Sequence, residues 1–234
     1  MCAAAYIDWD VYGTTTIDRY QTSIGIREMN LNTTASLEIG QPAAPSIPLL
    51  GTGTMRMRCQ SGVLHLIPKF PGATATERGL VRGRIRSIIR WNDLGGLLRF
   101  GIVVMQSALD LTTTPGNGYV CIFDTLGFTN TIRIGKMTGQ TLGSWTTLVS
   151  SSPAQFSDDV PLSIEFEWDA FSGVNCGLRV RRGVQTDFSD LVVLINYDDI
   201  SSPHVTSVAE GLFALPVSGN IDMYWDNTTI SKRV

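Results

Sequence analysis

The stretch that decides the fold is Ile164-Glu165-Phe166-Glu167-Trp168-Asp169 and then, beyond a turn at Gly173, Cys176-Gly177-Leu178-Arg179-Val180-Arg181-Arg182. Apolar and charged side chains alternate in both halves. A period of two is typical of a β-strand with one buried face. Folding the halves about Gly173 therefore predicts an antiparallel hairpin.

One register of this hairpin satisfies both faces. In it each glutamate faces an arginine and each aromatic ring faces an aliphatic side chain: Glu167 with Arg179, Glu165 with Arg181, Phe166 with Val180, and Trp168 with Leu178. A slip of one residue would turn every side chain to the wrong face. Each cross-strand pair contributes roughly 0.2–1 kcal/mol, so the charge pairs support the register without dominating stability.

The same alternation continues along the chain, and turn residues interrupt it at short intervals. No apolar period of 3.6 residues is long enough to predict a helix. Strands are expected at 5–12, at one or two places in 13–40, and at 54–59, 62–67, 80–91, 97–107, 117–124, 130–137, 144–149, 161–169, 177–183, 190–196, 210–215 and 221–231. This pattern predicts an all-β fold, a two-sheet antiparallel β-sandwich of the jelly-roll kind.

Residues 41–53 are the best candidate for a linker, because they contain three prolines and two glycines. Proline cannot donate a hydrogen bond to a neighbouring strand. We therefore expect residues 1–50 to form an N-terminal arm or added strands with a Pro-rich connector, and residues 51–234 to form the sandwich.

Composition excludes several classes of function. The 234 residues carry a formal net charge of -3 with 17% charged residues, which argues against a nucleic-acid partner. No apolar stretch reaches the length that inserts into a membrane, and the first residues do not have the pattern of a secretory signal. The four cysteines are far apart and there are two histidines, so neither a zinc site nor any other cofactor is expected.

The segment from about 54 to 231 resembles the concanavalin A-like lectin/glucanase superfamily, including laminin G-like modules. The residues that carry the resemblance are Gly96–Gly101, Gly118–Phe123, Thr131–Lys136, the hairpin Ile164–Arg182, Gly211–Phe213 and Asp222–Asn227. The last segment is similar to the "Tyr-Phe-Asp-Asn" closing strand of such domains, with Trp225 where phenylalanine is usual. The resemblance implies a concanavalin A-like sandwich over about three quarters of the chain.

Glu165, Glu167 and Asp169 are candidates for carbohydrate chemistry. Some retaining glucanases of the superfamily carry Glu-x-Asp-x-Glu at such a place, and retaining hydrolysis needs two carboxylates about 5–5.5 Å apart. This chain departs from that pattern at the middle and last positions. Cross-strand ion pairs with Arg179 and Arg181 on a solvated sheet face are the favoured interpretation.

Arg84 and Arg86 share one face of the strand expected at 80–91, together with Arg90. They could bind an anionic sugar or a partner protein, but a mixed-charge sheet surface that meets the carboxylates is favoured. Calcium ligands drawn from Asp198, Asp199, Glu210, Asp222 and Asp226 are weighed against acids that solvate loops, and the second interpretation is favoured. His65 is expected to be structural. No metal site is therefore predicted.

The sequence leaves two functions open. The favoured one is a non-enzymatic structural or interaction protein, a phage virion component for capsid decoration or tail association, synthesised in the cytoplasm. Residues 1–50 would then contact other subunits of a larger assembly, and the sandwich would reach a cell-surface glycan. The alternative is a glycan-active hydrolase or lyase that uses the carboxylates of strand 161–169.

Overall fold

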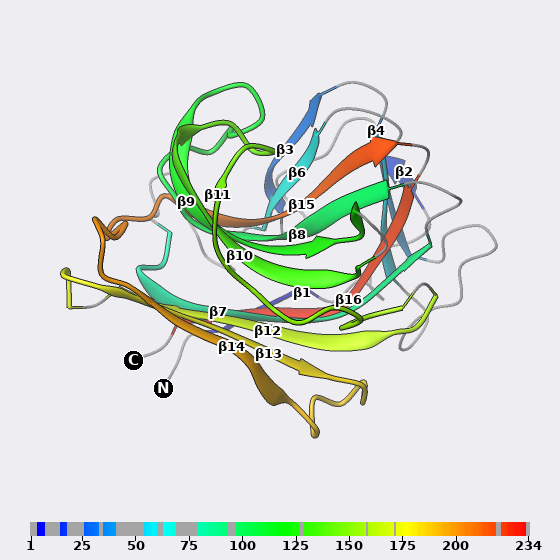
Figure 1. Ribbon diagram of the computed structural model, residues 1–234. Coiled ribbons are helices and arrows are strands. Elements are labelled where there is room, and N and C mark those ends of the chain that lie inside the picture. The colour runs from blue at the N-terminus through cyan, green and yellow to red at the C-terminus, as the bar shows by residue number, and fades with distance from the viewer. Residues whose placement is uncertain are drawn as a thin grey trace.

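The computed structural model describes residues 4–7, 15–17, 26–32, 35–40, 54–59, 63–68, 79–92, 97–126, 129–157, 159–170, 172–218 and 221–232. These residues form two antiparallel β-sheets packed face to face, as predicted (Figure 1). No helix in this part of the chain has the length and apolar character needed to cross a membrane.

Sheet A has nine strands in the order β14-β13-β12-β7-β16-β5-β4-β2, with β1 also pairing to β16. Its strands are β1 (Ala4–Ile7), β2 (Thr15–Ile17), β4 (Ala35–Gly40), β5 (Thr54–Cys59), β7 (Arg82–Asn92), β12 (Leu162–Asp169), β13 (Cys176–Gly183), β14 (Val192–Asp199) and β16 (Ile221–Lys232). The strands β7, β12, β13 and β14 lie side by side along the bottom of Figure 1.

Sheet B has seven strands in the order β11-β10-β9-β8-β15-β6-β3. They are β3 (Ile26–Asn32), β6 (Val63–Pro68), β8 (Leu97–Gln106), β9 (Gly116–Asp124), β10 (Thr131–Gln140), β11 (Thr146–Ser150) and β15 (Ala209–Ser218). Strands β8, β9 and β10 bend strongly, so that the face turned away from sheet A is concave (Figure 1).

Each of the twelve strands expected between 54 and 231 is present, with ends that move by at most three residues. The hairpin of β12 and β13 has the predicted register, with Glu165 opposite Arg181 and Glu167 opposite Arg179. The range 13–40 holds three strands, β2, β3 and β4, where one or two were expected. The sequence signal was weak there because threonine-rich segments alternate little in polarity.

Strands from the first 40 residues pair with strands of the same chain. β1 pairs with β16, β4 pairs with β5, and β3 pairs with β6. The connector predicted at 41–53 lies outside the described residues, and so does the end of the strand expected at 5–12, beyond Ile7. The division of the chain at residue 50 stays a prediction.

The main core lies between the two sheets and is rich in aromatic rings. Trp91, Phe100, Phe123 and Phe156 form a connected group, with Phe100 and Phe123 stacked at 4.7 Å between ring centroids. Trp168 is fully buried, as predicted, and its indole Nε1 donates to the Leu80 carbonyl at 2.7 Å. Aromatic pairs of this kind add about 0.5–1.5 kcal/mol beyond the area they bury.

Candidate functional site

The residues singled out from the sequence come together on the outer face of sheet A. The pairing of β7, β12 and β13 places them in three rows: Arg86-Glu165-Arg181, Arg84-Glu167-Arg179 and Arg82-Asp169-Gly177. We call these rows the charged ladder. Strand β14 extends the second row with Asn196 and the third with Asp198. Sequence reasoning missed Arg82, which belongs to the same alternation on β7 as Arg84 and Arg86.

Glu165 is the middle residue of the first row and has no exposed surface. Its carboxylate accepts hydrogen bonds from Arg86 Nε and Arg181 Nη1, and Arg84 Nη1 lies 3.7 Å away. Burial raises the pKa of this carboxyl group, but the hydrogen bonds and charges of Arg86 and Arg181 outweigh burial and hold the pKa below its ordinary value. Glu165 is therefore held as a carboxylate.

The predicted ion pair of Glu165 with Arg181 is present, but the expectation that Glu165 lies on a solvated face was wrong. Its arginine partners are only partly exposed and contact its carboxylate from both sides, and the carboxylate has no exposed surface. This covering needs arginines on both neighbouring strands, β7 and β13. A salt bridge of this kind is buried on one side and solvated on the other.

The other two carboxylates of β12 also have arginine partners. Glu167 Oε2 accepts from Arg181 Nη1 at 3.0 Å, and Asp169 Oδ2 lies 2.9 Å from Arg82 Nε. The predicted ion pair of Arg179 with Glu167 was wrong, although the two residues are in register, because Arg181 reaches Glu167 instead. Arg179 donates from Nε to the side-chain oxygen of Asn196 at 3.1 Å and has no carboxylate within ion-pair distance among the described residues.

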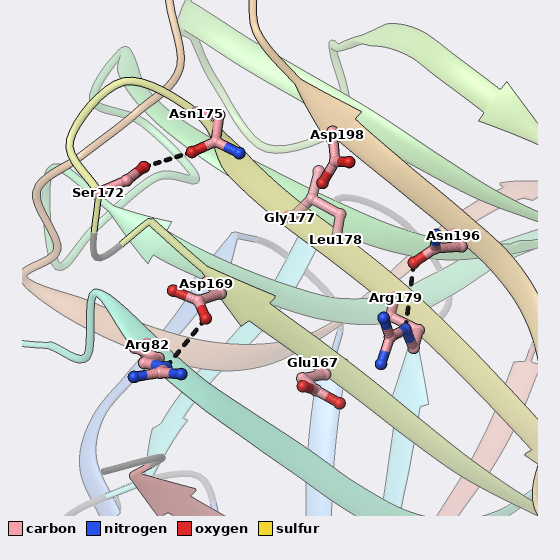
Figure 2. Close-up of a pocket in the computed structure, with 10 residues that line it drawn as sticks. All are labelled: Arg82, Glu167, Asp169, Ser172, Asn175, Gly177, Leu178, Arg179, Asn196 and Asp198. Atoms are coloured by element: carbon pink, nitrogen blue, oxygen red, sulfur yellow. Dashed lines mark hydrogen bonds and ion pairs between the residues drawn. The ribbon is translucent and has the colours of Figure 1, made fainter.

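A pocket of about 380 Å³ opens at the third row of the ladder. Figure 2 shows the side chains that line it: Arg82, Glu167, Asp169, Ser172, Asn175, Gly177, Leu178, Arg179, Asn196 and Asp198. Nearly all of them can form hydrogen bonds, and none is aromatic. Ser172 and Asn175, from the turn between β12 and β13, are hydrogen-bonded to each other at one rim.

Gly177 is the reason for the pocket. It lies between Asp169 on β12 and Asp198 on β14, at the position where Arg179 and Arg181 project their side chains in the first two rows. Its backbone is outside the left-handed region, so the conformation does not require glycine. An added Cβ would lie 3.2 Å from Asp198 Oδ1, the movable end of a side chain. Absence of a side chain here leaves the hollow open.

Of the other acids considered as calcium ligands, two have hydrogen-bond or ion-pair partners within the chain, and one lines the pocket. Asp199 lies 2.7 Å from Lys136 Nζ and accepts from the Tyr119 hydroxyl at 2.6 Å, while Glu210 accepts from Ser207 at 2.9 Å. Asp198 alone of these lines the pocket, and the side chains of Asp222 and Asp226 lie outside the described residues. Within the described ranges, no three His, Cys, Asp or Glu residues are grouped as metal ligands.

A second cluster of polar side chains lies on the concave face of sheet B. The indole ring of Trp145 packs over Gly135 and lies under the guanidinium of Arg99, 5.4 Å from the ring centroid. Arg99 and Arg133 both lie 3.4 Å from Asp124, whose side chain is buried. The strand expected at 144–149 includes Trp145, but β11 begins at Thr146, so alternation along the strand does not show which face this ring covers.

His65 lies fully buried on this same face, opposite Phe213 on β15. Neither of its ring nitrogens has a hydrogen-bond partner in the described part of the chain. Burial lowers its pKa to about 4, so the ring is neutral near pH 7. The structure thus places His65 in a packed environment.

No family model and no curated protein sequence matches the chain. The legume lectin-like domain from Entamoeba histolytica is similar in structure, with a TM-score of 0.55 and 8% identity over 91% of this chain and 92% of that domain.

Two further solved structures extend the likeness. The exoplasmic/lumenal domain of VIP36, in its Ca2+/Man3GlcNAc-bound form, has a TM-score of 0.54 and 9% identity over 76% of this chain and 78% of that domain. A mutant of the alginate lyase Aly36B, in complex with an alginate trisaccharide, has a TM-score of 0.51 and 10% identity over 99% of both chains. At such identities the likeness establishes the fold alone, and the phage and virion expectation finds no support in it.

Proposed function

We propose that this chain, whose fold is the concanavalin A-like sandwich, is a non-catalytic glycan-binding protein that holds its ligand in the pocket of sheet A. The pocket carries the proposal. It has the volume of a small ligand site, about 380 Å³, and presents amide, carboxylate, guanidinium and hydroxyl groups. Sugars are bound by many hydrogen bonds to such groups. The lectins with the same fold support the same class of ligand.

The groups that would bind sugar hydroxyls are held in place before any ligand arrives. Arg179 and Asn196 are fixed by their mutual hydrogen bond, and Asp169 is fixed by Arg82. Side chains positioned in this way lose little entropy when a ligand binds. Asp198 has no hydrogen-bond or ion-pair partner among the described residues, which leaves both its oxygens open to a ligand.

A glycan array tests the proposal, and titration calorimetry follows with the sugar that binds. Asn196→Ala removes a pocket side chain, and Val192→Ala is the matched control on the same strand because Val192 is exposed and does not line the pocket. We expect Asn196→Ala to weaken binding roughly tenfold, the effect of one or two lost hydrogen bonds. Equal binding by wild type and Asn196→Ala would contradict the pocket as the site.

A glycan-active hydrolase or lyase is the alternative, and the alginate lyase with this fold is the observation that favours it. Hydrolysis by two carboxylates requires one of them to be protonated as a general acid, which needs a raised pKa. The pKa of Glu165 is lowered, and Glu167 and Asp169 have arginine partners. Assays on a panel of β-glucans and alginate decide this point: turnover that disappears in Glu165→Gln and Glu167→Gln would establish the enzyme.

A place in a virion is a separate proposal that rests on the sequence expectations. It predicts that the chain occurs in a large particle together with other subunits. Deleting residues 1–50 would be a poor test, because β1, β3 and β4 pair with strands of the sandwich and their loss would disturb both sheets. Sedimentation of the full-length chain from the cells that produce it is the better test. A free monomer would contradict the proposal.

A further inference from the structure

The third row of the charged ladder differs from the other two in one respect. In the first two rows an arginine of β13 lies beside the carboxylate of β12, whereas the third row has Gly177 between Asp169 and Asp198. Strands are about 4.8 Å apart, so the two carboxylates start from Cα atoms roughly 10 Å apart with an open position between them. Figure 2 shows Asp198 beside Gly177, with Asp169 on the neighbouring strand.

The charges at this position are not balanced. Asp169 has Arg82 as a partner at 2.9 Å, but Asp198 has neither an ion pair nor a hydrogen bond in the described part of the chain. The nearest arginine of β13, Arg179, is directed to Asn196 at 3.1 Å in the second row. The third row therefore has two carboxylates and one guanidinium, and the nearest further cation, Arg179, belongs to the second row.

We propose that the pocket recognises an amino sugar, whose ammonium group occupies the position of the missing arginine between Asp198 and Asp169. This inference rests on the proposed glycan binding at the pocket and names its ligand class, a 2-amino-2-deoxyhexose with a free amine. The hydroxyl groups of the sugar meet Asn175, Asn196 and Arg179 around the rim. An ammonium group has three donors and suits two carboxylates on opposite sides.

Calorimetry with three trisaccharides tests the inference: the trimer of glucosamine, the same trimer with every amine acetylated, and the trimer of glucose. The titrations are made at about pH 6, where the sugar amine is protonated. We expect the glucosamine trimer to bind at least roughly tenfold more tightly than the other two, the effect of a charge-assisted hydrogen bond. Equal affinities for all three trimers would overturn the inference.

Two variants identify the position. Asp198→Asn keeps the shape of the side chain and removes its charge, and it is expected to remove the preference for the amine. Gly177→Arg supplies a guanidinium from the chain itself and is expected to abolish binding of the trimer while the protein stays folded, as circular dichroism will show. Asp187→Asn is the matched control, because Asp187 is an exposed acid in the turn between β13 and β14 that does not line the pocket.

The outcomes separate this inference from the proposed function. If acetylated or glucose trimers bind as well as the amine, and Gly177→Arg blocks them all, glycan binding at the pocket stands and the ammonium position is refuted. If the glucosamine trimer binds wild type, Asp198→Asn and Asp187→Asn alike, the attraction is a general effect of net charge, and the inference falls. If no trimer binds, the inference falls, and the glycan array with Asn196→Ala still decides the proposed function.

Discussion

Replacing Glu165 by glutamine tests whether the charged ladder stabilises the fold. The substitution keeps the shape of the side chain and removes a carboxylate that has no exposed surface. Its two hydrogen bonds come from Arg86 and Arg181, and bonds to charged groups contribute about 1.5–3 kcal/mol each. Both guanidiniums are partly exposed, at 34% and 25%, so water screens the charges. The glutamine oxygen also keeps one acceptor. We therefore expect a loss of about 2 kcal/mol in the free energy of unfolding at pH 7.

The pH dependence of this loss is the sharper measurement. The pKa of Glu165 is lower in the folded chain than its ordinary value of 4.5, so the carboxylate stabilises the fold above that value. The stabilisation is lost as the pH falls through the folded pKa. Urea unfolding, followed by tryptophan fluorescence, should thus show a higher free energy of unfolding for wild type than for Glu165→Gln at pH 7. This difference should become smaller at acidic pH. Asp187→Asn, at an exposed acid that is hydrogen-bonded to Ser189 in its own turn, should change the midpoint less than Glu165→Gln does. If the two free energies of unfolding are equal at pH 7, or if their difference stays constant into strong acid, the reasoning is refuted.

Three further predictions concern sheet B and the core. The pKa of His65 is lowered to about 4, so between about pH 4 and 6.5 the unfolded chain binds a proton that the folded chain does not. The free energy of unfolding should therefore rise by up to about 3 kcal/mol across this range, and urea unfolding of His65→Leu should not show this rise. In Gly135→Ala the new Cβ would lie 2.7 Å from Trp145 Cδ1, so the ring must move, and the fluorescence emission of Trp145 should shift to longer wavelength; unchanged emission would contradict the packing. Burial raises the pKa of both Cys121 and Cys176, so neither of these thiols should react with a disulfide reagent until urea unfolds the chain; rapid labelling of either one in the native protein, located by peptide mass spectrometry, would contradict this.

The sequence was sufficient for the twelve strands from residue 54 onward and for one register. Between Ile164 and Arg182 both faces carry a pattern, apolar on one side and charged on the other, and a single register satisfies the two together. The meeting of Arg84 and Arg86 with the carboxylates was also predicted, because the arginines alternate with Ile85 on their strand. Alternation along each strand predicts such pairs, because it shows which side chains of the strand lie on the same face of the sheet.

The pocket could not be predicted in the same way. It depends on Asp198 lying beside Gly177, and the pairing of β13 with β14 contains an irregularity between Val180 and Arg181 that shifts the register by one residue. Counting from the turn would therefore have placed the wrong side chain beside Gly177. The burial of Glu165 likewise depends on arginines from both sides of β12, one of which is 79 residues away in the sequence.

The ligand site is expected where a carboxylate of the charged ladder has no cationic partner. A catalytic pair must hold its two carboxylates in different protonation states, but the arginines of the first two rows favour the charged form of Glu165 and pair with Glu167. Those rows are therefore suited to holding β7, β12 and β13 together. In the third row the arginine position is empty and Asp198 is open to solvent, so an added cation would gain an interaction there that the fold does not already supply. Binding is thus expected at the gap, and the residues that resemble a glucanase motif form the rigid support beside it.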